Sequence, residues 1–219
     1  VAYYSNATKI VRMIYTMVIA FVATFYPRIA YYIQNDKRNE SDKLVEKGFD
    51  IILLTALPCA LGLMSTAKYI ILILFGNQYM NSIPVLKVSS GLVFVFSVAY
   101  LLGHVILMAS GQERYILKAT IIGATFNAIL NTCLIPKYAE NGAIIASVIS
   151  EVTVTSVLIF YSRKSFSISK DKSFVGSIGL SILLMIIGIA GVKKYFLFTD
   201  SIVFQFIEII LVAVLIYSV

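Results

Sequence analysis

Apolar positions along the chain are grouped in long blocks, and short polar segments separate these blocks. Each block approaches the roughly 20 residues that an α-helix needs to cross a bilayer. The alternation of apolar and polar residues that marks outer-membrane barrel strands is absent from the sequence. The pattern predicts an all-α fold, a polytopic transmembrane helical bundle in one domain over residues 1–219. About seven spans are expected, over residues 3–33, 45–63, 83–109, 114–134, 143–161, 174–192 and 200–219.

Several features interrupt or end these blocks. Pro27 lies in the last third of the first span, where a proline can kink a membrane helix at modest cost. The charged residues 34–47 predict a solvated loop that leads into the start of the next helix. Residues 67–75 are too few to span, and they predict an interfacial or re-entrant turn that ends at a glycine cap, Gly76. Pro136 is expected to stop the fourth span.

The composition indicates that lipid is the main solvent of this chain. Hydrophobic residues make up 59% of it and charged residues only 13%, against roughly 25% charged residues in soluble proteins. Cys59 and Cys133 lie in apolar runs and are predicted to be buried free thiols, with a disulfide as the alternative. Because His104 is the only histidine and no cysteine–histidine spacing suits a metal, no cofactor is expected.

The net charge of +7 is explained by membrane topology. In a soluble protein such a charge would suggest nucleic acid, but here the cations lie in short connections between spans, so no nucleic acid partner is expected. Ten Lys and Arg residues lie in the connections at 34–47, 110–118 and 162–173, and four lie in those on the other side. We therefore expect the first group to be cytoplasmic and the protein to reside in the inner (cytoplasmic) membrane.

The chain begins and ends inside apolar helical patterns. It starts at Val1 without an initiator methionine, and it shows no cleavable signal peptide. We expect a fragment of a longer protein whose N-terminal part is missing.

A polar stripe crosses the first span. Ser5, Lys9, Arg12 and Thr16 follow one another at steps of four, three and four residues, so they lie on one side of a helix. Charges inside a membrane are costly unless they face a cavity, form pairs or reach the interface. One interpretation is a cationic patch that binds an anionic substrate group, with Arg12 suited to bidentate phosphate binding. In the other interpretation Lys9 extends to the interface and Arg12 pairs with a carboxylate.

Further polar groups lie inside later spans. His104 ends a second stripe, and it predicts either proton coupling or a neutral histidine hydrogen-bonded between helices. Glu151 lies near the middle of the fifth span, and it predicts an ion-coupling carboxylate or a charge partner of Arg12. Asn127 and Asn131 share one helix face and are expected to bond across helices. The remaining members of the second stripe are Lys87, Ser90, Ser97 and Tyr100.

The order of several short motifs resembles the polysaccharide flippases, the Wzx-type exporters of lipid-linked oligosaccharides within the multidrug/oligosaccharidyl-lipid/polysaccharide exporter superfamily. The segment 3–9 (YYSNATK) is similar to the opening of a helix in the second half of that family, and 74–79 (LFGNQY) to its LFGxxY turn. Residues 127–138 resemble its N-x-x-x-N…IPKY segment. Residues 141–151 resemble its GAAxAT…SE pattern, in which Gly142 supplies the flexible residue although Glu140 departs from the pattern.

The resemblance implies a second helical bundle of a two-bundle exporter with alternating access. The implied substrate is an undecaprenyl-pyrophosphate-linked oligosaccharide that moves from the inner to the outer leaflet for surface polysaccharide (O-antigen or capsule) synthesis. A proton or sodium ion is the implied coupling ion, and polysaccharide polymerase machinery is an expected partner.

Two other functions stay open at this stage. A cation-coupled multidrug exporter of the same superfamily would favour a cavity rich in carboxylates. A non-transporting membrane subunit of polysaccharide synthesis would not need charge inside the membrane. No enzymatic constellation appears in the sequence, so a transporter is expected rather than an enzyme.

Overall fold

The computed structural model describes residues 2–163, 165–166, 172–195 and 202–217. Within these ranges all regular structure is helical, which confirms the all-α prediction. The elements in chain order are α1 (Ala2–Ala23), α2 (Tyr26–Gln34), α3 (Arg38–Phe75), the 3₁₀ turn η1 (Asn77–Tyr79), α4 (Ser82–Ser89), α5 (Leu92–Tyr100), the π-helical η2 (Leu101–Leu107), α6 (Glu113–Ser162), α7 (Lys172–Tyr195) and α8 (Ile202–Tyr217).

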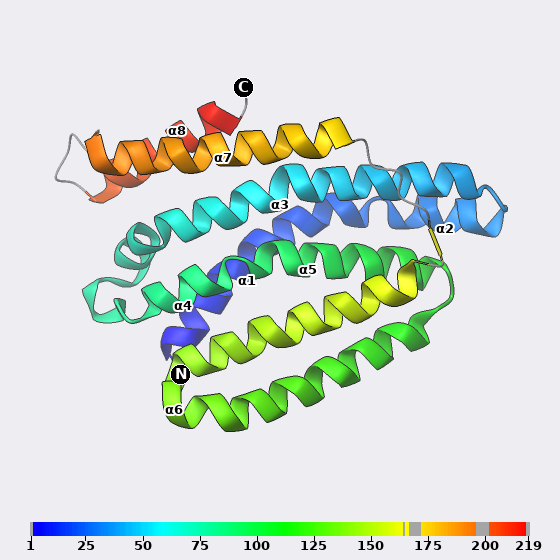
Figure 1. The fold of residues 1–219 in the computed structure, drawn as a ribbon, viewed down its shortest axis with the longest axis horizontal. Helices are drawn as coiled ribbons and strands as arrows, with labels where there is room; N and C mark the ends of the chain where they lie inside the picture. Colours follow the sequence, from blue (N-terminus) through cyan, green and yellow to red (C-terminus); the bar gives the residue numbers. More distant parts are fainter. Residues whose placement is uncertain (1, 164, 167–171, 196–201, 218–219) are drawn as a thin grey trace.

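The described helices provide seven apolar segments, which lie at the positions of the seven predicted spans. Four stretches have the length and composition to cross a membrane, and shorter apolar helices lie within α7 and α8. One of the four stretches, α6, has 50 residues and reverses direction at Ala139, where φ is 47° and ψ is −127°. Its two arms, residues 113–138 and 140–162, therefore correspond to two of the expected spans (Figure 1).

The first span is interrupted just before Pro27. Helix α1 ends at Ala23, a short turn follows, and Pro27 falls in the first turn of α2. A proline at that position removes no helical hydrogen bond, because the first N–H groups of a helix have no partner within it. The helix break therefore precedes Pro27 and lies within one candidate span, Tyr3–Gln34.

Helix α3 overturns two predictions. It runs over 38 residues with Pro58 in its interior, and residues 67–75 form its last turns instead of a separate interfacial piece. Gly76 ends the helix with φ at 80°, so the predicted glycine cap is confirmed. Residues 38–47, predicted as a loop, form its first turns, because Lys, Arg and Glu are good helix formers whether or not lipid surrounds them.

The turn between the arms of α6 depends on close backbone contact. The predicted stop at Pro136 is wrong, because the chain stays helical past this residue and reverses only at Ala139. A Cβ atom on Gly142 would collide with the backbone carbonyl of Leu134. Glycine is therefore required at position 142 because a side chain has no space there. The sequence comparison had assigned this glycine to backbone flexibility.

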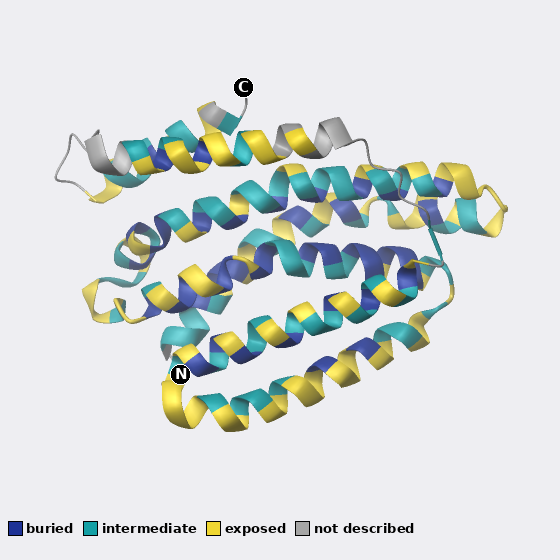
Figure 2. Cartoon of the chain, viewed as in Figure 1, coloured by how far each residue is buried: buried dark blue, intermediate teal, exposed yellow. Residues whose placement is uncertain are grey.

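One apolar core joins α1, α3, the α4–η2 segment and α6, and α7 and α8 pack beside α3 (Figure 1). A smaller cluster of Tyr69, Met185, Ile189 and Ile209 forms the contact between α3 and this helix pair. Many large apolar side chains are exposed on the outside of the bundle, for example along the first arm of α6 (Figure 2). Such a surface is expected where lipid replaces water as the solvent.

Cys59 and Cys133 are free thiols, as predicted. Both are exposed, so the prediction that they are buried is wrong. An apolar run in a membrane helix presents side chains to lipid as well as to the core, and hydropathy alone does not separate the two.

Three connections gather at one end of the bundle. The α2–α3 turn, the η2–α6 turn and the end of α6 lie together there, and the α3–α4 turn and the reversal of α6 lie at the other end (Figure 1). This arrangement agrees with the grouping of the loop cations. A cytoplasmic position of the first end remains a prediction from the charge rule.

Candidate functional site

The polar stripe of α1 lies along the open side of this helix. Lys9, Arg12 and Thr16 are exposed, and Ser5 is half-buried. The Thr16 hydroxyl donates a hydrogen bond to the backbone carbonyl of Arg12 at 2.6 Å. The opposite side of the helix packs into the core through Ala7, Ile10, Val11, Val18 and Val22. The structure therefore places two cations on the accessible face of a membrane-spanning helix.

Aromatic and hydroxyl contacts fix the beginning of α1. The Tyr4 hydroxyl lies 3.0 Å from the Ser147 hydroxyl on the second arm of α6. The ring of Tyr3 meets that of Tyr79 edge-on, with centroids 5.9 Å apart. Glu151 follows Ser147 by one helical turn on the same face of α6.

Glu151 and His104 line the same pocket, which has a volume of about 200 Å³. The pocket lies between α1, α5, η2 and both arms of α6. Its other polar lining groups are Tyr15, Tyr100 and Thr120. A pocket of this size with several polar partners has room for water molecules. The two titratable residues that the sequence predicts as ion-coupling candidates are thus brought together.

The sequence predicts Glu151 as a possible charge partner of Arg12. The structure gives no ion pair within 4.0 Å between these two residues, and Arg12 is not among the residues that line the pocket. Arg12 is exposed, whereas Glu151 is half-buried. Opposite charges stabilise one another inside a membrane, where each would be costly alone. The pairing of Arg12 with Glu151 therefore stays a prediction from the sequence.

His104 lies in the π-helical segment η2, which no sequence pattern predicts. Its ring stacks on Tyr100, with centroids 5.0 Å apart and planes inclined by 5°. Single π-helical turns within α-helices are frequently found at functional sites. Only part of the predicted second stripe reaches this place, because Ser90 and Ser97 are buried and donate to backbone carbonyls of their own helices.

The amide pair of α6 bonds within its own helix. Nδ2 of Asn131 donates to Oδ1 of Asn127 at 2.8 Å. The sequence predicts bonds from these amides to other helices, and this hydrogen bond differs from that prediction. A four-residue spacing stacks the two amides on one face, where Asn131 donates to Asn127. Oδ1 of Asn131 is buried and has no hydrogen-bond partner among the described residues.

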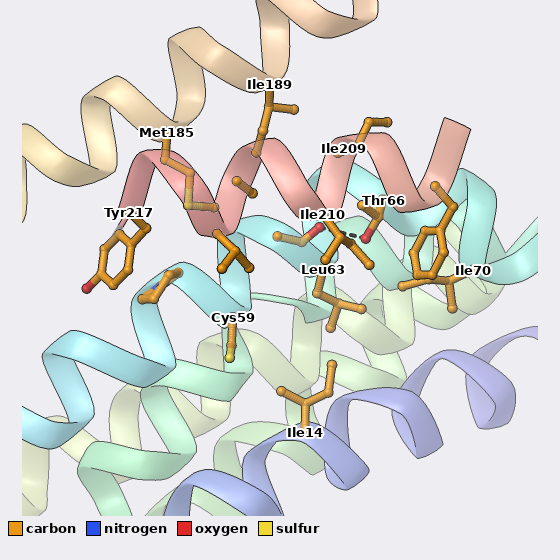
Figure 3. A pocket seen from close by; sticks show the side chains of 15 residues that line it. Ile14, Cys59, Leu63, Thr66, Ile70, Met185, Ile189, Ile209, Ile210 and Tyr217 are labelled. Atoms are coloured by element: carbon orange, nitrogen blue, oxygen red, sulfur yellow. Dashed lines mark hydrogen bonds between the residues drawn. The ribbon is translucent and has the colours of Figure 1, made fainter. Parts of the chain in front are cut away.

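Sequence reasoning missed a larger apolar pocket of about 460 Å³ (Figure 3). It lies between α3 and the pair α7–α8, and Ile14 of α1 closes one side of it. Thr66 is among its few polar lining residues, and its hydroxyl donates to the carbonyl of Gly62 at 2.7 Å. The lining includes Pro58, Leu63, Met185, Ile189, Phe206 and Ile210. No local sequence signal reveals such a pocket, because it arises only where α8 packs against α3.

A family model described as "Lipid II flippase MurJ" matches residues 1–214. The chain belongs to the MurJ family. The MurJ fold is seen directly in a solved structure titled "Lipid II flippase MurJ, inward closed conformation". That structure matches with a TM-score of 0.80 and 22% sequence identity, over 99% of this chain and 45% of the MurJ chain.

Two curated relatives also match this MurJ-family chain. The "Probable low-salt glycan biosynthesis flippase Agl15" of Haloferax volcanii is 24% identical over 182 residues, which are 83% of this chain and 38% of Agl15. The "Capsular polysaccharide biosynthesis protein CapF" of Staphylococcus aureus is 28% identical over 141 residues, 64% of this chain and 35% of CapF. The chain thus spans less than half the length of these relatives. The names of MurJ and Agl15 agree with a membrane transporter rather than an enzyme.

Proposed function

We propose that this chain is part of a flippase that moves a diphosphate-linked lipid oligosaccharide from the inner to the outer leaflet by alternating access. Family membership supports a multi-pass membrane flippase, and the exposed cations Lys9 and Arg12 in a membrane-spanning helix carry the assignment. An exporter of cationic drugs would be disfavoured by two positive charges on that face, because like charges repel. The finer proposal, a Wzx-type exporter for O-antigen or capsule, is supported by the motif order and by the CapF relative.

The cations of α1 are proposed to receive the diphosphate. A diphosphate that leaves water loses a large hydration energy, so it needs charged donors along its path. Arg12 offers a planar fork that binds two phosphate oxygens at once, whereas Lys9 provides a compact single charge. Ser5 and Thr16 extend the stripe on both sides and add hydroxyl groups one turn from each cation.

The apolar pocket beside α7 and α8 is proposed to hold part of the lipid chain. Apart from a few polar groups its lining is aliphatic or aromatic, and it borders α1, the helix that carries the cations (Figure 3). Burying methylene groups there would contribute roughly 0.8 kcal/mol each relative to water. A lipid whose head group binds at α1 could therefore extend its chain into the pocket between α3 and the α7–α8 pair.

A polysaccharide complementation assay tests this function. Arg12→Ala in the full-length protein should reduce surface polysaccharide at least about tenfold, because a charge-assisted bond contributes about 1.5–3 kcal/mol. Arg12→Lys should retain part of the output, since it keeps the charge without the fork. Arg28→Ala is the matched control, because Arg28 is also exposed but lies on α2 outside the stripe.

Immunoblots of the membrane fraction establish that the variants are present in equal amounts. Normal polysaccharide output from Arg12→Ala at equal protein level would reject the role of Arg12. Loss of drug resistance in place of polysaccharide would instead favour the multidrug exporter.

A further inference from the structure

A polar pocket lies at the end of the bundle where three connections gather. It has a volume of about 350 Å³, and the α2–α3 turn, the η2–α6 turn and the segment after α6 contribute to its lining. Its lining residues are Ile33, Asp36, Arg38, Ser110, Gln112 and Ser165. None of them belongs to the cationic stripe of α1, to the pocket of Glu151 or to the apolar pocket beside α7 and α8.

The position of this pocket in the chain corresponds to the depth of the lipid head groups. Each of its polar lining residues lies at the end of a candidate membrane span or within a few residues of it. Tyrosine is typical of the membrane–water interface, and on the preceding helix α2 the rings of Tyr31 and Tyr32 meet edge-on with centroids 5.8 Å apart. The cations of this end predict a cytoplasmic position, so lipids of the inner leaflet are the ligands nearest to the pocket.

Two opposite charges line the pocket without meeting. Asp36 and Arg38 are both exposed, and the structure gives no ion pair within 4.0 Å between them. A ligand that carries one negative and one positive group can therefore bind both side chains at once. A ligand with negative charge alone would be attracted by Arg38 but repelled by Asp36. The pair of charges thus favours a zwitterion over an anion.

The uncharged polar groups of the pocket agree with the same kind of ligand. The Ser165 hydroxyl donates to Oε1 of Gln112 at 3.3 Å, which leaves the amide nitrogen of Gln112 to donate to a phosphate oxygen. The Ser110 hydroxyl donates to the backbone carbonyl of Ile106 at 2.8 Å, so its oxygen can accept a hydrogen bond from an ammonium group. The pocket therefore offers donors to an anionic group and acceptors to a cationic one.

We infer that this pocket binds a phosphoethanolamine head group, and that its carrier is a membrane lipid. Arg38 and the amide nitrogen of Gln112 bind the phosphate, while Asp36 and the hydroxyl oxygen of Ser110 bind the primary ammonium group. Each charge of the head group then has a charge-assisted hydrogen bond. A lipid held in this way joins the α2–α3 turn to the η2–α6 turn. The inference is independent of the function proposed for Arg12, because Arg12 does not line this pocket.

Native mass spectrometry of the purified full-length protein in detergent measures this binding. The probes are phosphatidylethanolamine, phosphatidylcholine and phosphatidylglycerol with identical acyl chains, added one at a time, and the bound fractions give dissociation constants. Wild type should bind phosphatidylethanolamine at least about threefold more tightly than either of the other lipids. Phosphatidylcholine is the control for the ammonium group, because its quaternary nitrogen has no N–H to donate. Phosphatidylglycerol is the control for the charge, because its head group is an anion.

Two substitutions separate the roles of the two charges. Arg38→Gln should weaken the binding of phosphatidylethanolamine about three- to fivefold, as for exposed charge pairs. Asp36→Asn should remove the preference over phosphatidylcholine and should bind phosphatidylglycerol more tightly than wild type does, because the repulsion is gone. Asparagine tolerates the φ of 54° at position 36, so this variant should fold, and circular dichroism checks that it does. Lys37→Gln is the matched control, because it removes a charge from the same turn outside the pocket lining, and it should leave all three affinities unchanged.

Several results would overturn the inference. Equal wild-type affinities for phosphatidylethanolamine and phosphatidylcholine would exclude recognition of the ammonium group. Tighter binding of phosphatidylglycerol than of phosphatidylethanolamine would show a site for anions. An equal loss of affinity in Lys37→Gln and Arg38→Gln would show attraction by the charged end as a whole, without the pocket. Competition by free O-phosphoethanolamine at the concentrations that the lipid needs would identify a soluble ligand in place of a lipid.

Discussion

Arg12 lies on α1 and Glu151 lies on α6, and the fold packs these two helices against each other. Neither residue has an oppositely charged residue three or four positions away in the sequence that could pair with it. The sequence identified both because an ionisable group inside an apolar span requires a partner. Tyr100, which also lines the pocket, belongs to the second stripe that the sequence predicts, whereas Tyr15 gave no such signal, since aromatic residues are common in apolar helices.

A double-mutant cycle measures the interaction between these two charges. The predicted pairing of Arg12 with Glu151 implies that Arg12→Ala and Glu151→Ala each lower the thermal stability of the full-length protein in detergent, because each removes the partner of the other charge. The double variant should be less destabilised than the sum, by about 0.5–1 kcal/mol, as for partly exposed pairs. Strictly additive effects would show that the two side chains do not interact.

At the scale of single elements, the length of the apolar runs was enough to locate the spans from the sequence. The ends of the helices depend on tertiary packing. The continuous α3 and the π-helical η2 were not predictable, because helix continuity outside the apolar region and a change of helical pitch depend on packing. The turn in α6 was expected near Pro136, and its true position is set by the contact between Gly142 and the backbone of Leu134.

Gly142→Ala is expected to destabilise the protein by about 1–3 kcal/mol or more, because the added methyl group collides with a backbone carbonyl that cannot move alone. Thermal unfolding followed by circular dichroism measures this loss. Gly179→Ala is the matched control, since a Cβ there meets nothing within 4 Å. It should be neutral or slightly stabilising, because alanine is the better helix former. Equal stability of both variants would contradict the packing explanation of the turn.

At the scale of the whole molecule, the candidate site has three parts arranged around α1. The cationic stripe lies on its open side, the pocket of Glu151 lies toward α5 and α6, and the apolar pocket lies toward α3, α7 and α8. The sequence predicted that the residues of the stripe lie on one side of the helix, and it singled out Glu151, His104 and Tyr100 of the second part, whose roles stay predictions. It missed the third, because apolar residues that line a pocket have the same pattern as those that face lipid.

Filling the apolar pocket tests its proposed role. Gly62 lines the pocket, and a Cβ on it meets nothing within 4 Å, so Gly62→Leu should fold and keep its stability within about 1 kcal/mol. The added side chain would occupy space that the lipid chain needs, so flipping should fall severalfold. Gly179→Leu adds the same side chain on an exposed surface and should leave flipping unchanged. Unaltered flipping by a stable Gly62→Leu would exclude the pocket as a lipid site.

The transfer of a fluorescent undecaprenyl-diphosphate oligosaccharide between leaflets of proteoliposomes tests the central claim most directly. Wild type and Arg28→Ala, each as the full-length protein, should move the lipid at equal rates, and Arg12→Ala should be at least about tenfold slower. Quenching by a reagent confined to the outside reports the transferred fraction, and protein-free vesicles give the background rate. Equal transfer by Arg12→Ala and wild type would contradict the claim that the stripe on α1 receives the diphosphate.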